Sequence, residues 1–224
     1  MPFAMTHLII ADRLYGIFGQ HIDDQPQFML GSVAPDAVHN RAEYVSDFKK
    51  ASHLCVGDEK WGYLTNTGEW TANVVRFARE HIGSGDKDFI LGYCAHILSD
   101  IYNNMTEWIP FKARFPDEAA KGYGNAHHQD SNRIDIELSL THGDRDRFRQ
   151  DLSLSKGVDL PGVIYSSEIE KQKDNILNVW YAGKERPDLS ANRIVTYESM
   201  MKFIDGAVGF IEPVYRTNIL KNEY

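Results

Sequence analysis

Apolar residues recur every three or four positions through most of the chain, which is the spacing that predicts amphipathic helices. The first such helix is predicted over residues 6–18, with Thr6 suited to cap its start and His7 in its first turn. Its apolar stripe consists of Ile10, Leu14, Ile17 and Phe18. This stripe predicts one buried face, with the opposite face toward solvent.

Further helices are predicted from the same spacing over residues 69–81, 88–104, 127–140, 161–183 and 192–215. In the last of them the residues expected to pack inward are Ile194, Met201, Ile204, Val208 and Ile211. Between these segments we expect a Gly- and Pro-punctuated turn at residues 31–36, an ordered loop or short helix at 108–123, and a highly charged, solvated turn or helix end at 141–154. Strand signals are few and no linker divides the chain, so the sequence predicts an all-α, single multi-helix domain over residues 1–224.

The predicted helix over residues 88–104 is the most apolar, and it carries His96 and Asp100 four residues apart. Side chains at this spacing lie on one face of a helix, about 6 Å apart. An unpaired carboxylate in such apolar surroundings is very costly. The pair must therefore be satisfied, either by a bound metal ion or by an internal hydrogen bond.

Charge and cysteine content narrow the possible classes of protein. The formal net charge of −8 argues against stable nucleic-acid binding, although metal ions could supply local positive charge for a phosphodiester. The two cysteines, Cys55 and Cys94, form no CxxC pair, which favours a reducing compartment. The N-terminus has no basic region before its apolar run, and no stretch approaches the roughly 20 apolar residues of a transmembrane span. We therefore expect a cytoplasmic protein without a transmembrane segment.

Nine histidines occur in the chain, and several of them stand beside apolar runs at helix-like positions. Imidazole and carboxylate groups are the usual ligands of zinc and related divalent metals in catalytic sites. The spacing His96-x-x-x-Asp100 is the most specific of these signals, because both side chains must converge within an apolar helix. The other histidines, taken singly, do not indicate a metal site; they support one only in combination with this pair.

Several short motifs, in this order, resemble the zinc-dependent phospholipase C family, which belongs to an all-α superfamily that also contains zinc nucleases. The matching segments are Thr6-His7, the turn Gly31 to Asp36, Ser52-His53, Gly92-Tyr93-Cys94-Ala95-His96-Ile97-Leu98-Ser99-Asp100, and His128 with Asn132 and Asp135. They span roughly residues 1 to 140. Each motif alone is weak, and their order carries the resemblance.

The resemblance implies a cluster of two or three zinc ions, although other divalent metals could take the same ligands. The residues implied as ligands are His7, Asp36, His53, His96, Asp100 and His128. Asp36 would bridge metal ions or act as catalytic base toward a metal-bound water. The implied activity is phosphodiester hydrolysis, and the implied substrate is a small phosphodiester or phospholipid-type molecule.

The late helix departs from the family pattern. Family members carry a glutamate four residues after the late histidine, whereas this chain has Asn132 after His128 and Ser131 after His127. Neither is a strong zinc ligand, so either Asp135 substitutes or the third metal site is lost. His127 and His128 both stay open as the late ligand, and His128 is favoured because Asn132 and Asp135 share its face.

Metal chemistry explains why these residue types suit phosphodiester hydrolysis. Two ions about 3.5–4 Å apart can activate a water and neutralise the leaving oxygen, and a bound water can have its pKa lowered toward roughly 7. Two alternatives stay open. One is a metal-free or single-metal helical module that binds a ligand or partner without turnover. The other is an HD-type phosphohydrolase, which needs an adjacent His-Asp dipeptide that this sequence lacks.

Overall fold

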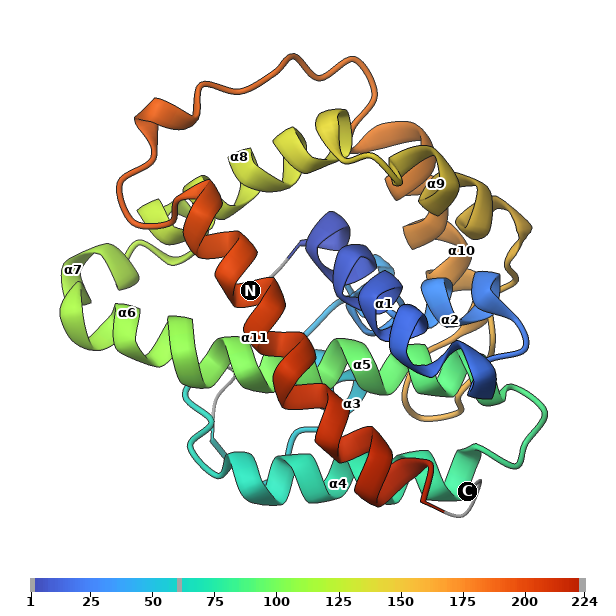
Figure 1. Ribbon diagram of the computed structural model, residues 1–224. Coiled ribbons are helices and arrows are strands. Elements are labelled where there is room, and N and C mark those ends of the chain that lie inside the picture. The colour runs from blue at the N-terminus through green and yellow to red at the C-terminus, as the bar shows by residue number, and fades with distance from the viewer. Residues whose placement is uncertain (1–2, 60–61, 222–224) are drawn as a thin grey trace.

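Helix α5 (Lys87–Asn103) runs through the middle of the computed structural model and is surrounded by other helices (Figure 1). All of its residues except Lys87 and Tyr102 are buried. Helices α1 (Ala4–Phe18), α2 (Gln25–Gly31), α4 (Thr67–His81) and α11 (Tyr197–Val214) pack directly against it. A helix that is apolar on every side can be stable only in such a central position.

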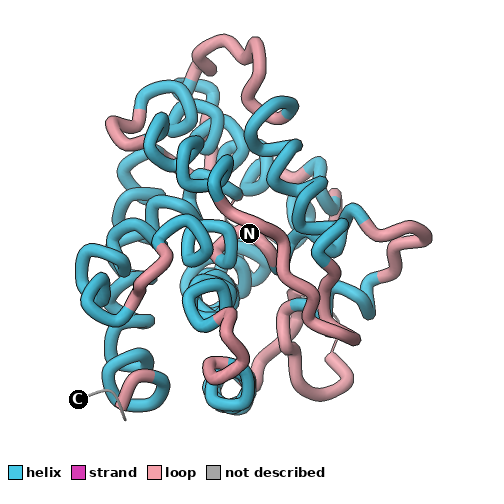
Figure 2. The backbone as a smooth tube through the Cα atoms, turned by 90° about the vertical axis from the view of Figure 1, so that its right-hand side faces the viewer, coloured by secondary structure: helices cyan, strands magenta, loops and turns pink. Residues whose placement is uncertain are grey.

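The structure describes residues 3–59 and 62–221, and within them the regular elements are helices (Figure 2). The remaining α-helices are α3 (Ser46–Ser52), α6 (Ile109–Arg114), α7 (Pro116–Ala119), α8 (Ala126–Thr141), α9 (Arg145–Leu154) and α10 (Ser166–Asp174). The short 3₁₀ segments are η1 (Gly19–His21), η2 (Pro35–Asn40), η4 (Gly122–Gly124) and η6 (Leu189–Ala191). The π-helical turns are η3 (Asn104–Trp108), η5 (Asn175–Val179) and η7 (Tyr215–Ile219). One isolated bridge, Leu160 to Ile164, is the extent of strand-like pairing in the described residues.

Two glycines allow α2 and α5 to cross with their backbones almost in contact. A Cβ atom on Gly92 would lie 1.9 Å from the carbonyl oxygen of Phe28, and one on Gly31 would lie 2.2 Å from that of Phe89. Any other residue at either position would force the helices apart. The crossing brings the chain after α2 to the middle of α5, beside His96.

The connection between α10 and α11 runs along the outer side of α8 (Figure 1). Its backbone is held by Asp130, a buried residue of α8. One oxygen of the Asp130 carboxylate accepts hydrogen bonds from three successive amides, at Arg193, Ile194 and Val195. These bonds satisfy the buried carboxylate and fix the segment that leads into α11.

The all-α prediction is confirmed, and most predicted helices occur within a few residues of their expected limits. Of the first apolar stripe, Ile10, Leu14 and Phe18 are buried. Cys94 is buried as well, and burial raises the pKa of its thiol. The described helices share one hydrophobic core. None of the helices within residues 3–59 and 62–221 is both long enough and apolar enough to cross a membrane.

Some local predictions were wrong. The helix that carries His7 begins at Ala4, so Thr6 lies inside it and uses its amide and hydroxyl to bind Asp135. The predicted turn at residues 31–36 ends in the 3₁₀ segment η2, which contains Asp36. The segment expected to be a solvated turn or helix end contains a whole helix, α9, whose Phe148 and Leu152 are buried. Two apolar residues four positions apart are enough to dock a short, otherwise charged helix.

Residues 108–123, expected to form an ordered loop or short helix, contain the short helices α6 and α7. The limits of two predicted helices differ from the prediction. The helix predicted over residues 161–183 is limited to α10 and η5, because residues 161–165 form a turn after the Leu160 bridge. The last helix begins at Tyr197 rather than Asn192, since Asp130 binds the amides of Arg193, Ile194 and Val195 in a bend before it.

Candidate metal centre

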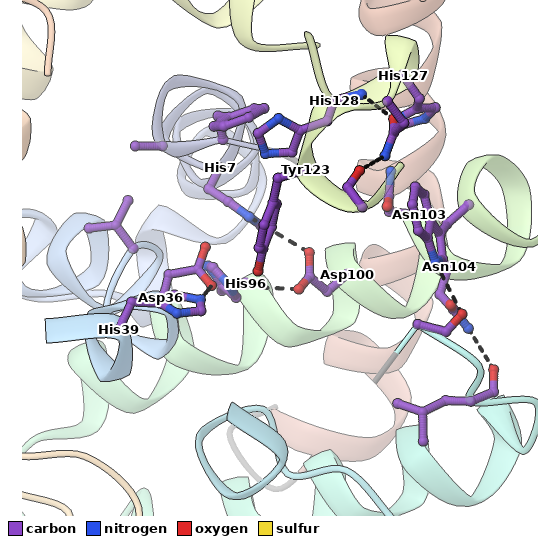
Figure 3. A pocket seen from close by; sticks show the side chains of 18 of the residues that line it. His7, Asp36, His39, His96, Asp100, Asn103, Asn104, Tyr123, His127 and His128 are labelled. Carbon is purple, nitrogen blue, oxygen red and sulfur yellow. Dashed lines mark hydrogen bonds and ion pairs between the residues drawn. The ribbon is translucent and has the colours of Figure 1, made fainter. Parts of the chain in front are cut away.

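Four separate segments place imidazole and carboxylate groups around one point. His7 comes from α1, Asp36 from η2, His53 from the residue that ends α3, and His96 and Asp100 from α5. Figure 3 shows His7, His96 and Asp100 directed toward one another, with Asp36 beside them. The structure therefore brings together five of the seven residues that the sequence suggested as ligands.

Asp100 is the most informative member of this cluster. It is 3% exposed, and neither of its carboxylate oxygens has a hydrogen-bond partner. Burial raises its pKa, because the anion loses the solvation that water would provide. A carboxylate in this situation needs a bound cation or a proton.

The three histidines present the same nitrogen, Nε2, to the cluster. Nδ1 of His96 donates to the carbonyl oxygen of Ser32 at 2.8 Å, which leaves Nε2 without a proton in the neutral ring. Nδ1 of His7 lies 3.0 Å from Oγ of Ser99, whose own proton goes to the carbonyl oxygen of His96. The ring of His7 must then donate to Ser99.

His53 is oriented in the same way. Its Nδ1 lies 3.1 Å from the carbonyl oxygen of Lys49 and 2.9 Å from Oγ of Ser52. Burial lowers the pKa of His53 to about 3 and that of His7 well below its usual value, so both rings are neutral. Bonds of this kind fix the tautomer of metal-binding histidines and orient their rings.

The spacing of the ligand atoms fits a tetrahedral metal site. Ligands about 2.0–2.1 Å from a zinc ion lie about 3.4 Å from each other at the corners of a tetrahedron. Nε2 of His53 lies 3.3 Å from Nε2 of His96 and 3.4 Å from an oxygen of Asp100. The distances from Asp100 to Nε2 of His7 and of His96 are 3.8 and 4.0 Å. Lone pairs that face one another at these distances repel unless a cation lies between them.

These side chains form two overlapping groups able to hold a metal ion. One group is His7, His96 and Asp100, and the other is Asp36, His53 and His96. Both use His96, whose Nδ1 is already bonded to the backbone. Only Nε2 of His96 is available to a metal ion, and one nitrogen binds one ion. The two groups therefore cannot each bind an ion through His96, and we treat them as parts of one centre.

Asp36 has a further partner, Lys49. The Lys49 ammonium donates to Oδ1 of Asp36 at 2.7 Å and to Nε2 of His39 at 3.2 Å, although its side chain is 2% exposed. Burial favours the protonated form of Asp36, but the Lys49 ammonium outweighs it, and the pKa lies well below its usual value. Asp36 is therefore an anion fixed by a buried cation.

The centre lies at the wall of a cavity of about 590 Å³. His7, Asp36, His39, His96 and Asp100 line it on one side. The other walls are mainly aromatic and include Phe3, Tyr63, Trp70, Trp108, Tyr123 and Trp180. This volume suits a small organic molecule whose polar group reaches the histidines.

The late helix does not reach the centre. His128 lines the cavity, but its ring packs edge-on against Phe3 and Tyr123. Asp135 is buried elsewhere, where it accepts hydrogen bonds from Thr6 and from the hydroxyl of Tyr181 at 2.5 Å. Asn132 is exposed. Neither His128 nor Asp135 belongs to a group of three potential metal ligands within the described residues.

His127 lies at the far end of the cavity (Figure 3). It is buried between Trp108 and Phe111, and its ring nitrogens have no hydrogen-bond partner. Burial lowers its pKa to about 3. In these surroundings the ring behaves as a neutral aromatic side chain.

Sequence reasoning did not identify Lys49 and Ser99 as parts of the site. Lys49 stands in a polar run beside Lys50, where nothing distinguishes it from a surface lysine. Its one available signal was its position four residues before His53, on the same helical face. Ser99 lies in the most apolar helix three residues after His96, a position from which a hydroxyl can bond back to the backbone.

No protein-family model matches the chain, and no curated protein or solved structure gives a match. The function must therefore be argued from the side chains themselves.

Proposed function

We propose that this protein is a metal-dependent hydrolase of phosphate esters, of the phospholipase C-like phosphodiesterase type, with zinc as its metal ion. One observation carries the proposal. Three histidine Nε2 atoms converge on the buried carboxylate of Asp100, which has no hydrogen-bond donor of its own. Donor types, donor distances and backbone-fixed tautomers all fit a zinc site.

In this proposal His7, His53, His96 and Asp100 hold the metal. A bound divalent ion supplies Lewis acidity toward a phosphoryl oxygen and makes water a better nucleophile. The ester would enter through the aromatic cavity, so that its phosphate meets the histidines. The aromatic walls would hold the organic substituent and keep bulk water out, which strengthens electrostatic interactions at the centre.

Asp36 would act on the attacking water. One of its oxygens is held by Lys49, and the residue lines the cavity beside the centre. A carboxylate fixed in this way can accept a hydrogen bond from water and hold it in line with phosphorus. His39 also lines the cavity. Because its Nε2 accepts from Lys49, the neutral ring carries its proton on Nδ1 and can donate it in a hydrogen bond.

The test combines metal analysis with hydrolysis of a generic phosphodiester, bis(p-nitrophenyl) phosphate, and of p-nitrophenyl phosphorylcholine. We expect purified protein to contain zinc and to hydrolyse at least one of the two esters. His96→Ala should lose both the metal and the activity, by more than about 100-fold, since changes at residues that only orient ligands already cost 10–100-fold. His142→Ala is the matched control, because His142 packs against Phe148 away from the centre.

Two results would count against the proposal in different ways. Folded protein that binds no divalent metal would exclude the metal centre. Protein that binds zinc through His96 but hydrolyses neither ester would favour a metal-containing binding module over an enzyme.

A further inference from the structure

A buried lysine, Lys49, lies beside the cluster of histidines and carboxylates. Its ammonium forms an ion pair with Asp36. Burying a lysine is costly unless it is paired. Here the ammonium donates to the carboxylate of Asp36 and to the ring of His39. Asp36 belongs, with His53 and His96, to the second group of side chains able to hold a metal ion, so a second ion would be expected to bind at its carboxylate.

From this arrangement we propose that Lys49 takes the place of a second metal ion, so that the centre binds a single divalent ion per chain. The inference rests on the metal centre proposed above and fixes its stoichiometry. It departs from the two or three ions that the sequence resemblance implied.

The charges of the cluster support one ion. Asp36 and Asp100 contribute two negative charges, and Lys49 contributes one positive charge. One divalent ion brings the sum to +1, whereas two ions bring it to +3 in a buried space. An excess of this size is unfavourable where water cannot solvate it.

The number of ligands supports the same conclusion. Two ions would have to divide three histidine nitrogens and two carboxylates, and His96 cannot serve both. One oxygen of Asp36 is already occupied by Lys49. A single ion, by contrast, finds His7, His53, His96 and Asp100, enough for a complete tetrahedral set.

Lys49 is therefore a positioning residue. Because its side chain is 2% exposed, it acts through Asp36 and His39 rather than by touching a substrate. It keeps Asp36 fixed as an anion and available to a water molecule. It also supplies the positive charge that would otherwise require a second metal ion.

The test is the number of Zn²⁺ ions bound per chain, measured after gel filtration by elemental analysis and, independently, by titration with Co²⁺ followed by absorbance. We expect one ion for the wild type and two for Lys49→Met, because removing the ammonium makes both Oδ1 of Asp36 and Nε2 of His39 available to a second ion. Lys50→Met is the matched control and should bind one, because the Lys50 ammonium donates to the carbonyl oxygen of Gly57 away from the centre.

Each outcome bears on a separate claim. Two ions in the wild type would overturn the inference and leave the metal centre intact, whereas no bound ion would overturn the proposed function itself. One ion in folded Lys49→Met would show that Lys49 does not exclude a second. If that variant fails to fold, Lys49→Gln, which keeps a hydrogen-bond donor without the charge, is expected to bind two.

Discussion

At the scale of single residues, the centre depends on backbone and hydroxyl groups that are not ligands themselves. Ser99 accepts from Nδ1 of His7 and passes its own proton to the carbonyl oxygen of His96. The hydroxyl of Ser99 therefore keeps the proton of His7 on Nδ1, and it is itself held by the backbone of His96. In the proposed centre, a residue that is not itself a ligand would thus influence how tightly the metal ion binds.

We therefore expect Ser99→Ala to weaken zinc binding about 10–100-fold, because His7 loses the bond that orients its ring. The measurement is competition with a chromophoric chelator. Ser139→Ala is the matched control, since Ser139 donates to a carbonyl three residues earlier in α8 and should leave the affinity unchanged. Equal affinities for the two variants would show that Ser99 does not orient the ligand.

At the scale of the elements, the crossing of α2 and α5 determines whether the site can form. The carbonyl of Ser32, just after α2, accepts the Nδ1 proton of His96 on α5. That bond requires the close approach that Gly92 permits. Helix packing and the orientation of a ligand are therefore coupled at this point.

Gly92→Ala should destabilise the protein by at least about 3 kcal/mol, the upper end of the usual cost of overpacking, because the obstacle is backbone. Urea unfolding measures the change. Gly209→Ala on α11 is the control: a Cβ there meets nothing within 4 Å, so alanine should stabilise the helix by about 0.5–1 kcal/mol. A Gly92→Ala protein as stable as the wild type would contradict the close crossing.

The elements also show what the sequence could predict. Periodic apolar stripes identified the long helices, and the i, i+4 pair His96 and Asp100 marked the centre. Helix α9 was missed because its charged residues outnumber its buried ones. Lys49 was missed because its burial depends on Asp36 and His39, which reach it only through the tertiary fold. Asp135, a predicted ligand, accepts hydrogen bonds from Thr6 and Tyr181. The spacing of residues along a helix cannot distinguish a buried carboxylate that binds a metal ion from one that accepts hydrogen bonds.

At the scale of the whole molecule, buried neutral histidines make stability depend on pH. The folded-state pKa of His127 is lowered to about 3, whereas in the unfolded chain it is near 6.5. Below pH 6.5 the unfolded chain therefore binds a proton that the folded protein does not. Stability is fully present at neutral pH and falls with acidification, by about 1.4 kcal/mol per pH unit for this residue.

Replacing His127 by Phe, which suits its aromatic surroundings, should remove this contribution. In metal-free protein the variant should gain about 2 kcal/mol relative to the wild type between neutral pH and pH 5. Urea unfolding at a series of pH values measures the difference, and other titrating groups cancel in it. Parallel curves for the two proteins would mean that His127 is protonated equally in the folded and unfolded states.

One part of the cavity wall comes from a later stretch of the chain than the metal centre. All five side chains of the centre lie between residues 7 and 100, whereas the cavity residues Trp108, Tyr123 and Trp180 come later. Tyr123 is 74% exposed and Trp180 is 38% exposed, so neither supports the core. The later wall can consequently change, in evolution or in a directed library, while the five side chains of the candidate centre stay constant, so that the molecules the cavity accepts can change without rebuilding the centre.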